Sequence, residues 1–215
     1  MVALFRVLFL AVALLSAPFA SAGQPDEVMN RVGAWFKIFD AALDHWSVAV
    51  PNADNQRVVL TRKSPVAGPE RRVMVVFPRK SSAYDVAMTQ LLADFAAKPI
   101  NAVFVAVHYG NDPVRGSALA AEAERSGYDL VYAMGSETVA FLHERHRNIT
   151  VPVVTVCAKD PVQLGQIDDY DTGSGNSFAF TSLNLRVDAQ LAYLRELKPN
   201  LRNLAILVDT RNVSA

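Results

Sequence analysis

The sequence predicts a doubly wound α/β domain, in which a parallel sheet is covered by helices on both faces. Between residues 71 and 161, short continuous apolar runs of strand length alternate with segments of helical periodicity. Strands that read as continuous apolar runs are typical of parallel sheets buried on both faces. The regular alternation of strand and helix supplies the crossover connections that such a sheet requires.

The first 22 residues carry the three-part pattern of a secretory signal peptide. Arg6 is followed by an apolar run from Val7 to Leu15 and by small residues that end at Ala22. A membrane anchor is the alternative, but the run is shorter than the roughly 20 residues that span a bilayer. We expect cleavage after Ala22 and a soluble, periplasmic mature protein.

Residues 23–70 are predicted to form an N-terminal helix, a short hairpin and a linker. Residues 25–46 have helical apolar spacing, and we expect this helix to pack onto the following domain. Residues 47–63 fit a hairpin whose turn is PNADN, and residues 64–70 have the composition of a linker. The apolar positions of the helix are Val28, Val32, Trp35, Phe36, Phe39 and Leu43.

From residue 71 onward, each element follows from its own pattern. Asp112 and Pro113 cap and start one helix, and Gly127 ends it. Strands are predicted at 72–77, 101–107, 129–134 and 151–157. Helices are predicted at 83–98, 113–126 and 136–145.

Charge and composition exclude several classes of function. Lysine and arginine number 21, as do aspartate and glutamate, so no general attraction to nucleic acid is expected. The single Cys157 reads as a small buried residue at a strand end. His143 and His146 read as part of a solvated helix face, without a further ligand that would indicate a metal. No cofactor is indicated.

Enzyme signatures are also missing from the sequence. No G-x-S-x-G elbow, phosphate-binding loop or dinucleotide fingerprint occurs, and no nucleophile–base pair supports an exported hydrolase. The glycine-rich stretch 170–176 reads as a flexible connection. We therefore expect a binding protein rather than an enzyme.

Ligands of doubly wound sheets bind at the carboxyl ends of the strands, where four loops should gather. These loops comprise residues 78–81, 108–111, 135–138 and 158–161. Gly135 permits a tight turn, and Ser136 either binds an anion with the next helix N-terminus or only caps that helix. Glu137 would repel an anion if it pointed inward.

Four segments in order resemble the periplasmic substrate-binding proteins of ABC transporters, in the branch for tryptophan and aromatic amino acids. They are YDLVYAMGSETVAFL, ITVPVVTVCAKDPVQLG, LAYLRELKPNLRNLAIL and VDTRNVSA. That family has two Rossmann-like lobes that close over a small ligand. The resemblance places a first lobe at residues 71–175 and a crossover with a second lobe only begun at 176–215. Either the chain is truncated or its second lobe is incomplete.

The resemblance implies a periplasmic protein that delivers a small polar ligand, such as an amino acid, to an inner-membrane ABC permease. A sensor or partner-binding module on the same fold is the alternative. Glu137 and Lys159 depart from the small or hydroxyl residues of the family. Asp160 is expected to be an exposed ligand-binding carboxylate, or else to stabilise only its own turn. The implied ligand-binding residues are Arg79, Lys80, Ser81, Gly135, Ser136, Thr138 and Asp160.

Overall fold

The computed structural model describes residues 30–51, 54–183, 185 and 187–205, so the predicted signal peptide lies outside the described residues. It contains a seven-stranded sheet of order β1-β2-β4-β3-β5-β6-β7. The strands are β1 (Trp46–Ala49), β2 (Arg57–Arg62), β3 (Arg71–Phe77), β4 (Ala102–His108), β5 (Leu130–Met134), β6 (Val153–Val156) and β7 (Phe178–Ala179). Strands β4, β3, β5, β6 and β7 are parallel to one another, whereas the β1–β2 hairpin joins β4 in antiparallel fashion.

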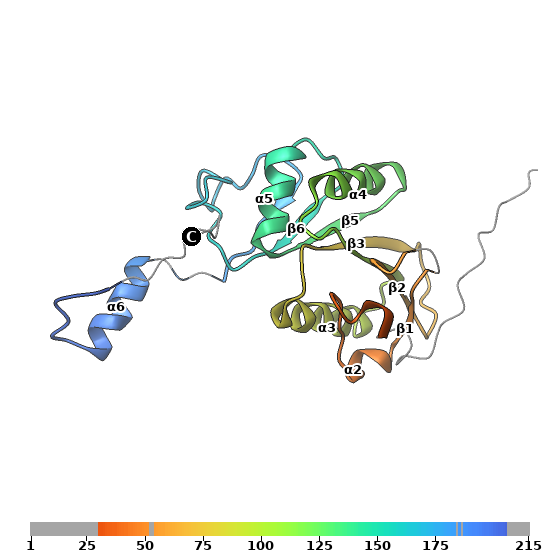
Figure 1. The fold of residues 1–215 in the computed structure, drawn as a ribbon, viewed down its shortest axis with the longest axis horizontal. Coiled ribbons are helices and arrows are strands. Elements are labelled where there is room, and N and C mark those ends of the chain that lie inside the picture. The colour runs from red at the N-terminus through yellow and green to blue at the C-terminus, as the bar shows by residue number, and fades with distance from the viewer. Residues whose placement is uncertain (1–29, 52–53, 184, 186, 206–215) are drawn as a thin grey trace, which may run out of the picture.

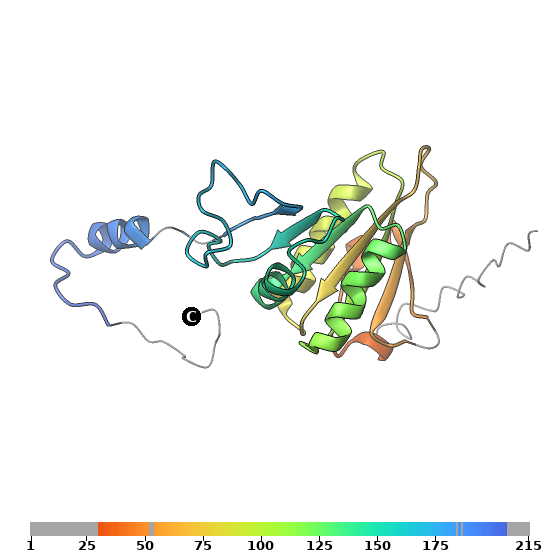
Figure 2. The ribbon, with the colours of Figure 1, turned by 90° about the horizontal axis from the view of Figure 1, so that it is seen from above.

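Helices cover both faces of this sheet, which confirms the predicted fold class (Figures 1 and 2). One face carries α2 (Asp40–Leu43) and α3 (Ser82–Ala96), and the other carries α4 (Pro113–Arg125) and α5 (Gly135–Arg145). Two apolar clusters fill the space between sheet and helices, one on each face. Alternate residues of β3 point into the two clusters, so the central strand is buried on both sides.

The N-terminal segment differs from the continuous helix that its spacing predicts. The helical turn at residues 30–32 ends at Gly33, residues 36–39 are neither helix nor strand, and α2 is only four residues long. Glycine is a poor helix former, and Phe36 and Ile38 are both buried, as in an extended segment. Phe39, predicted on the apolar face, is 43% exposed. We call residues 33–39 the N-terminal strap.

The predicted hairpin is present as β1 and β2, and it is part of the main sheet. Its pairing with β4 runs from Arg57 opposite Val107 to Thr61 opposite Val103. The indole of Trp46 donates a hydrogen bond to the Leu92 carbonyl of α3 at 3.0 Å. The N-terminal region therefore packs onto the following domain through this hairpin, although the continuous helix that was expected to make the contact does not form.

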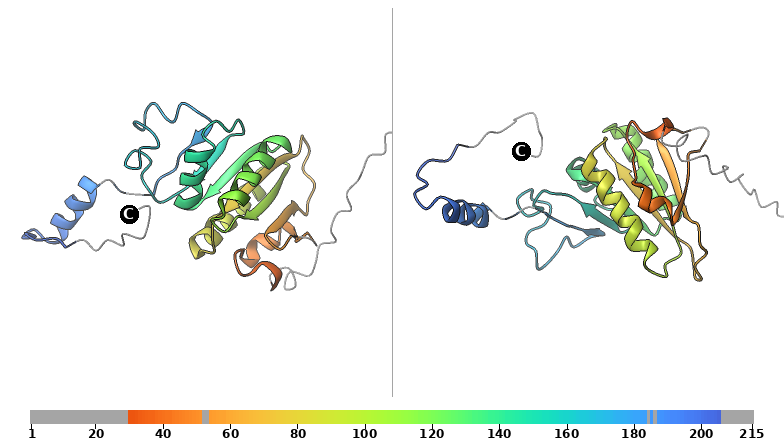
Figure 3. Two further views of the ribbon diagram at one scale, coloured as in Figure 1. Left: turned by 45° about the horizontal axis from the view of Figure 1, so that its top comes forward. Right: turned by 90° about the horizontal axis from the view of Figure 1, so that it is seen from below.

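After β7, the described residues contain one further helix, α6 (Val187–Leu197), which has no buried residue. Figure 3 shows α6 apart from the sheet. Its exposed apolar side chains include Tyr193 and Leu197, at 57% and 79% exposure. Residues 201–205 form no strand. Among the described helices, none is long and apolar enough to cross a membrane.

Candidate functional site

The strand order places a topological switch point between β3 and β5. The chain leaves β3 through α3 to reach β4 on one side, and it then returns through α4 to β5 on the other side. The loops that follow β3 and β5 therefore diverge to opposite faces of the sheet. In open α/β sheets this divergence creates the crevice in which ligands bind.

Gly135 makes the turn from β5 into α5, as the sequence predicts. Its φ angle is +82°, a conformation that side chains with a Cβ rarely adopt. A Cβ atom at this position would lie 1.9 Å from the hydroxyl oxygen of Tyr84. Only glycine allows the ring of Tyr84, which comes from the first turns of α3, to approach the start of α5 so closely.

Arg79 and Glu137 meet across the switch point. Arg79 Nε donates to Glu137 Oε1 at 2.8 Å, and the Tyr84 hydroxyl donates to Glu137 Oε2 at 3.3 Å. The guanidinium also lies over the Tyr84 ring, 5.8 Å from its centroid. The charge of Glu137 is thus paired with the guanidinium of Arg79. An anionic ligand at this edge would therefore not face an unpaired carboxylate.

The protonation states of this cluster follow from its contacts. Burial alone would raise the pKa of Glu137, but the hydrogen bond and charge of Arg79, together with a backbone hydrogen bond and that of Tyr84, outweigh it and lower that pKa. Burial and the negative charge of Glu137 raise the pKa of Tyr84 to about 12. At neutral pH, Glu137 is therefore ionised and Tyr84 remains a hydrogen-bond donor.

Ser136 and Thr138 do not take the positions that the sequence predicts. The N-cap residue of α5 is Met134, so Ser136 lies inside the first turn, where its hydroxyl is 3.1 Å from Cys157 Sγ. Thr138 is fully buried. Cys157 is buried at the strand end, as expected.

Lys80 and Ser81 make structural contacts in the loop that follows β3. The Lys80 ammonium donates to the carbonyl of Gly33 in the N-terminal strap. Ser81 is the N-cap residue of α3, although its hydroxyl makes no capping hydrogen bond. Of the three candidate residues in this loop, only Arg79 extends to the switch point.

Asp160 is buried rather than exposed, which corrects the expectation from the sequence. Its side chain is 3% exposed, and Oδ1 accepts the backbone N–H groups of Val162 at 2.9 Å and Gln163 at 3.2 Å. Oδ2 accepts the hydroxyl of Tyr170. These contacts are those of a residue that stabilises its own loop. Asp160 also lines a cavity of about 420 Å³, together with Val162, Gln163, Tyr170, Val187 and Asp188.

The histidines of α5 also differ from the predicted solvated face. His143 is 8% exposed, and its ring packs edge-on against Phe178 and Phe180, with centroids 5.7 and 5.9 Å away. Burial lowers the pKa of His143, so its imidazole is neutral at neutral pH. His146 lies 3.1 Å from the Ser117 hydroxyl. Within the described ranges, no group of three or more potential ligands could hold a metal ion.

Tyr84 and Trp35 are the residues of this edge that the sequence alone did not single out. Tyr84 lies in a segment whose pattern predicts only a helix. The spacing of Trp35 places it on the apolar face of the predicted N-terminal helix. Trp35 stacks on His108, at 5.3 Å between centroids, and covers the carboxyl end of β4. The open part of the edge is therefore the β3–β5 half.

Comparisons with known proteins give no family. No family model matches the chain, and no curated protein matches it. One similar solved structure is the crystal structure of a conserved domain protein from Vibrio cholerae O1 biovar El Tor strain N16961. It shares 20% identity and has a TM-score of 0.48, over 60% of this chain and 44% of that one. The chain thus spans less than half of that structure, and a likeness at this level assigns no function.

Proposed function

We propose that this chain is the lobe of a periplasmic solute-binding protein that holds a small polar ligand at the switch point between β3 and β5. The ligand would be passed to an inner-membrane ABC permease. The observation that carries the proposal is the Arg79–Glu137 ion pair, which joins the two strand-end loops where α/β sheets bind ligands.

Both Arg79 and Glu137 can still bind a ligand while they are paired with each other. Only Nε of Arg79 is used, and in the described part of the chain its two terminal nitrogens make no hydrogen bond. The Arg79 side chain is 56% exposed. A guanidinium binds carboxylates through two parallel hydrogen bonds, and a carboxylate such as Glu137 accepts from an ammonium group. A ligand that carries both charges, such as an amino acid, would engage the pair without leaving either charge unmatched.

The contacts at this edge favour binding over catalysis. The Ser136 hydroxyl lies against the thiol of Cys157 and not against a histidine or carboxylate that could act as its base. The ionised Glu137 is held by Arg79, which makes it a weak proton acceptor. Closure of a second lobe over the site would supply affinity and signal occupancy, as in other hinged binding proteins.

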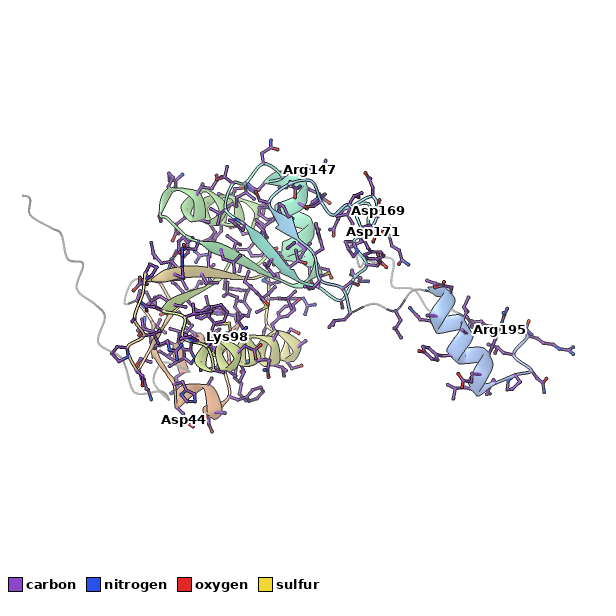
Figure 4. All side chains as sticks on the ribbon, turned by 180° about the vertical axis from the view of Figure 1, so that it is seen from behind. Asp44, Lys98, Arg147, Asp169, Asp171 and Arg195 are labelled. Atoms are coloured by element: carbon purple, nitrogen blue, oxygen red, sulfur yellow. The ribbon has the colours of Figure 1, made fainter. Side chains whose placement is uncertain are left out.

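The test is titration calorimetry of the purified chain against a panel of amino acids, after native mass spectrometry for a co-purifying small molecule. Arg79→Gln should weaken binding by about ten- to a hundredfold, the loss expected for charge-assisted hydrogen bonds. Arg147→Gln is the matched control, because Arg147 is an exposed arginine near the end of α5 (Figure 4). Equal affinity of Arg79→Gln and the unmodified protein would refute the proposed site.

A sensor or partner-binding module is the second candidate, and α6 is the observation that favours it. Its Leu191 and Leu194 are each 38% exposed, and Leu183, before the helix, is 82% exposed. Apolar surface of this kind promotes association with a partner. Under this alternative no panel member binds, and replacing Leu191 and Leu194 by lysine abolishes association measured by sedimentation velocity.

A further inference from the structure

The N-terminal strap is anchored at the carboxyl ends of β3 and β4 by Trp35. The indole ring stacks on His108 and packs edge-on against Phe77, the last residue of β3, at 5.7 Å between centroids. Its N–H donates to the carbonyl of Asn55 at 2.9 Å, and the residue is 5% exposed. A buried aromatic side chain with a satisfied polar atom holds its segment firmly in place.

The rest of the strap is bonded to the β3 loop and to the helix that follows it. Lys80 of the loop donates to the carbonyl of Gly33. The backbone N–H of Phe39 donates to the Thr89 hydroxyl of α3 at 3.2 Å. The strap therefore contacts the strand before the loop, the loop itself and the helix after it.

Arg79 lies in the middle of this arrangement. Its own side chain is more than half exposed, so burial does not fix its position. The backbone on either side is fixed instead, by Phe77 under Trp35 and by Lys80 on Gly33. A side chain presented by a rigid backbone loses less entropy when it binds a partner or ligand.

We infer that the N-terminal strap positions Arg79 at the switch point, and that Lys80 is the positioning residue through which it acts. The consequence for ligand affinity rests on the proposed function. The effect on Arg79 itself does not, because it can be measured in the protein without ligand. Lys80 thereby changes from a candidate ligand contact to a residue that acts through its neighbour.

The experiment measures hydrogen exchange of the Arg79 Nε–H signal by NMR in ¹⁵N-labelled protein. The hydrogen bond to Glu137 should protect this group, and Lys80→Met should speed its exchange by about two- to tenfold, the range for one lost hydrogen bond. Lys80→Met keeps the length of the side chain but cannot donate. Lys80→Arg, which can still donate to Gly33, should restore protection.

Lys98→Met is the control, because Lys98 is exposed beyond the end of α3 (Figure 4) and should leave the Arg79 signal unchanged. Exchange of the backbone amides 33–39 in the same samples reports on the strap. Faster strap exchange with an unchanged Arg79 signal would overturn the inference, as would no change in either. An Arg79 Nε–H that is unprotected in the unmodified protein would overturn both this inference and the proposed site.

Discussion

Arg79 and Glu137 are separated by 58 positions in the chain, and their side chains form an ion pair at 2.8 Å. The pair exists because β3 and β5 are neighbours in the sheet and their following loops turn to opposite faces. Glu137 also lies in the first turn of α5, where a negative charge is favourable for the helix. One carboxylate therefore has two stabilising partners, a helix N-terminus and a guanidinium.

The Arg79–Glu137 pair should make stability depend on acid pH. The folded-state pKa of Glu137 is lowered, so its contribution is present above about pH 4.3, the ordinary value for glutamate, and is lost as pH falls through the lower folded value. Because Arg79 is exposed, we expect the ion pair to add only about 0.2–1 kcal/mol to the free energy of unfolding. Urea unfolding of Glu137→Gln should show this deficit at pH 7 and none well below the folded pKa. A deficit that persists at acid pH would contradict the assignment.

Gly135→Ala should be strongly destabilising, because the new Cβ would meet both a positive φ and the hydroxyl of Tyr84. Gly127→Ala is the matched control: its φ is +66°, but nothing lies within 4 Å of the added atom. We expect Gly127→Ala to lower the free energy of unfolding by about 1–2 kcal/mol, because of backbone strain alone. Gly135→Ala should lower it by more. Urea unfolding measures both.

Adding Tyr84→Ala to Gly135→Ala should recover part of the loss, since the clash disappears and the strain remains. Equal unfolding free energies for Gly135→Ala and Gly127→Ala would show that Tyr84 does not press on this turn.

Asp160→Asn should lower the free energy of unfolding by about 1–3 kcal/mol, the range for disturbing a buried hydrogen-bonded charge. The physical reason is that the amide presents a donor toward the Tyr170 hydroxyl, where the carboxylate presents an acceptor. Tyr170→Phe, the comparison variant, removes the hydroxyl and leaves the backbone bonds of Val162 and Gln163 intact. Unchanged thermal unfolding together with weaker ligand binding in Asp160→Asn would instead identify a ligand contact.

The strands and helices of residues 71–157 were predictable because their patterns are local. The strands are continuous apolar runs, and Asp112 caps its helix by accepting the N–H groups of Val114 and Arg115. Gly135 was also readable from the sequence, since a turn directly after a buried strand calls for a positive φ. None of these features depends on a distant part of the chain.

The site was less predictable because its contacts are not local. The buried Asp160 accepts a hydrogen bond from Tyr170, which lies in a loop without any periodicity. Lys80 donates to the carbonyl of Gly33, in a strap that the sequence predicts to be part of a continuous helix. In each case, no local pattern in the sequence predicts that the two residues lie close together in the fold.

The β1–β2 hairpin also has a consequence for the order of folding. Strand β2 pairs with β4, which is synthesised only after β3 and α3, so the hairpin has no sheet edge to join until the chain has reached His108. Such non-local pairings form slowly. The hairpin can therefore take its place in the sheet only after β4 has been made, and the Trp35–His108 stack likewise requires the last residue of β4.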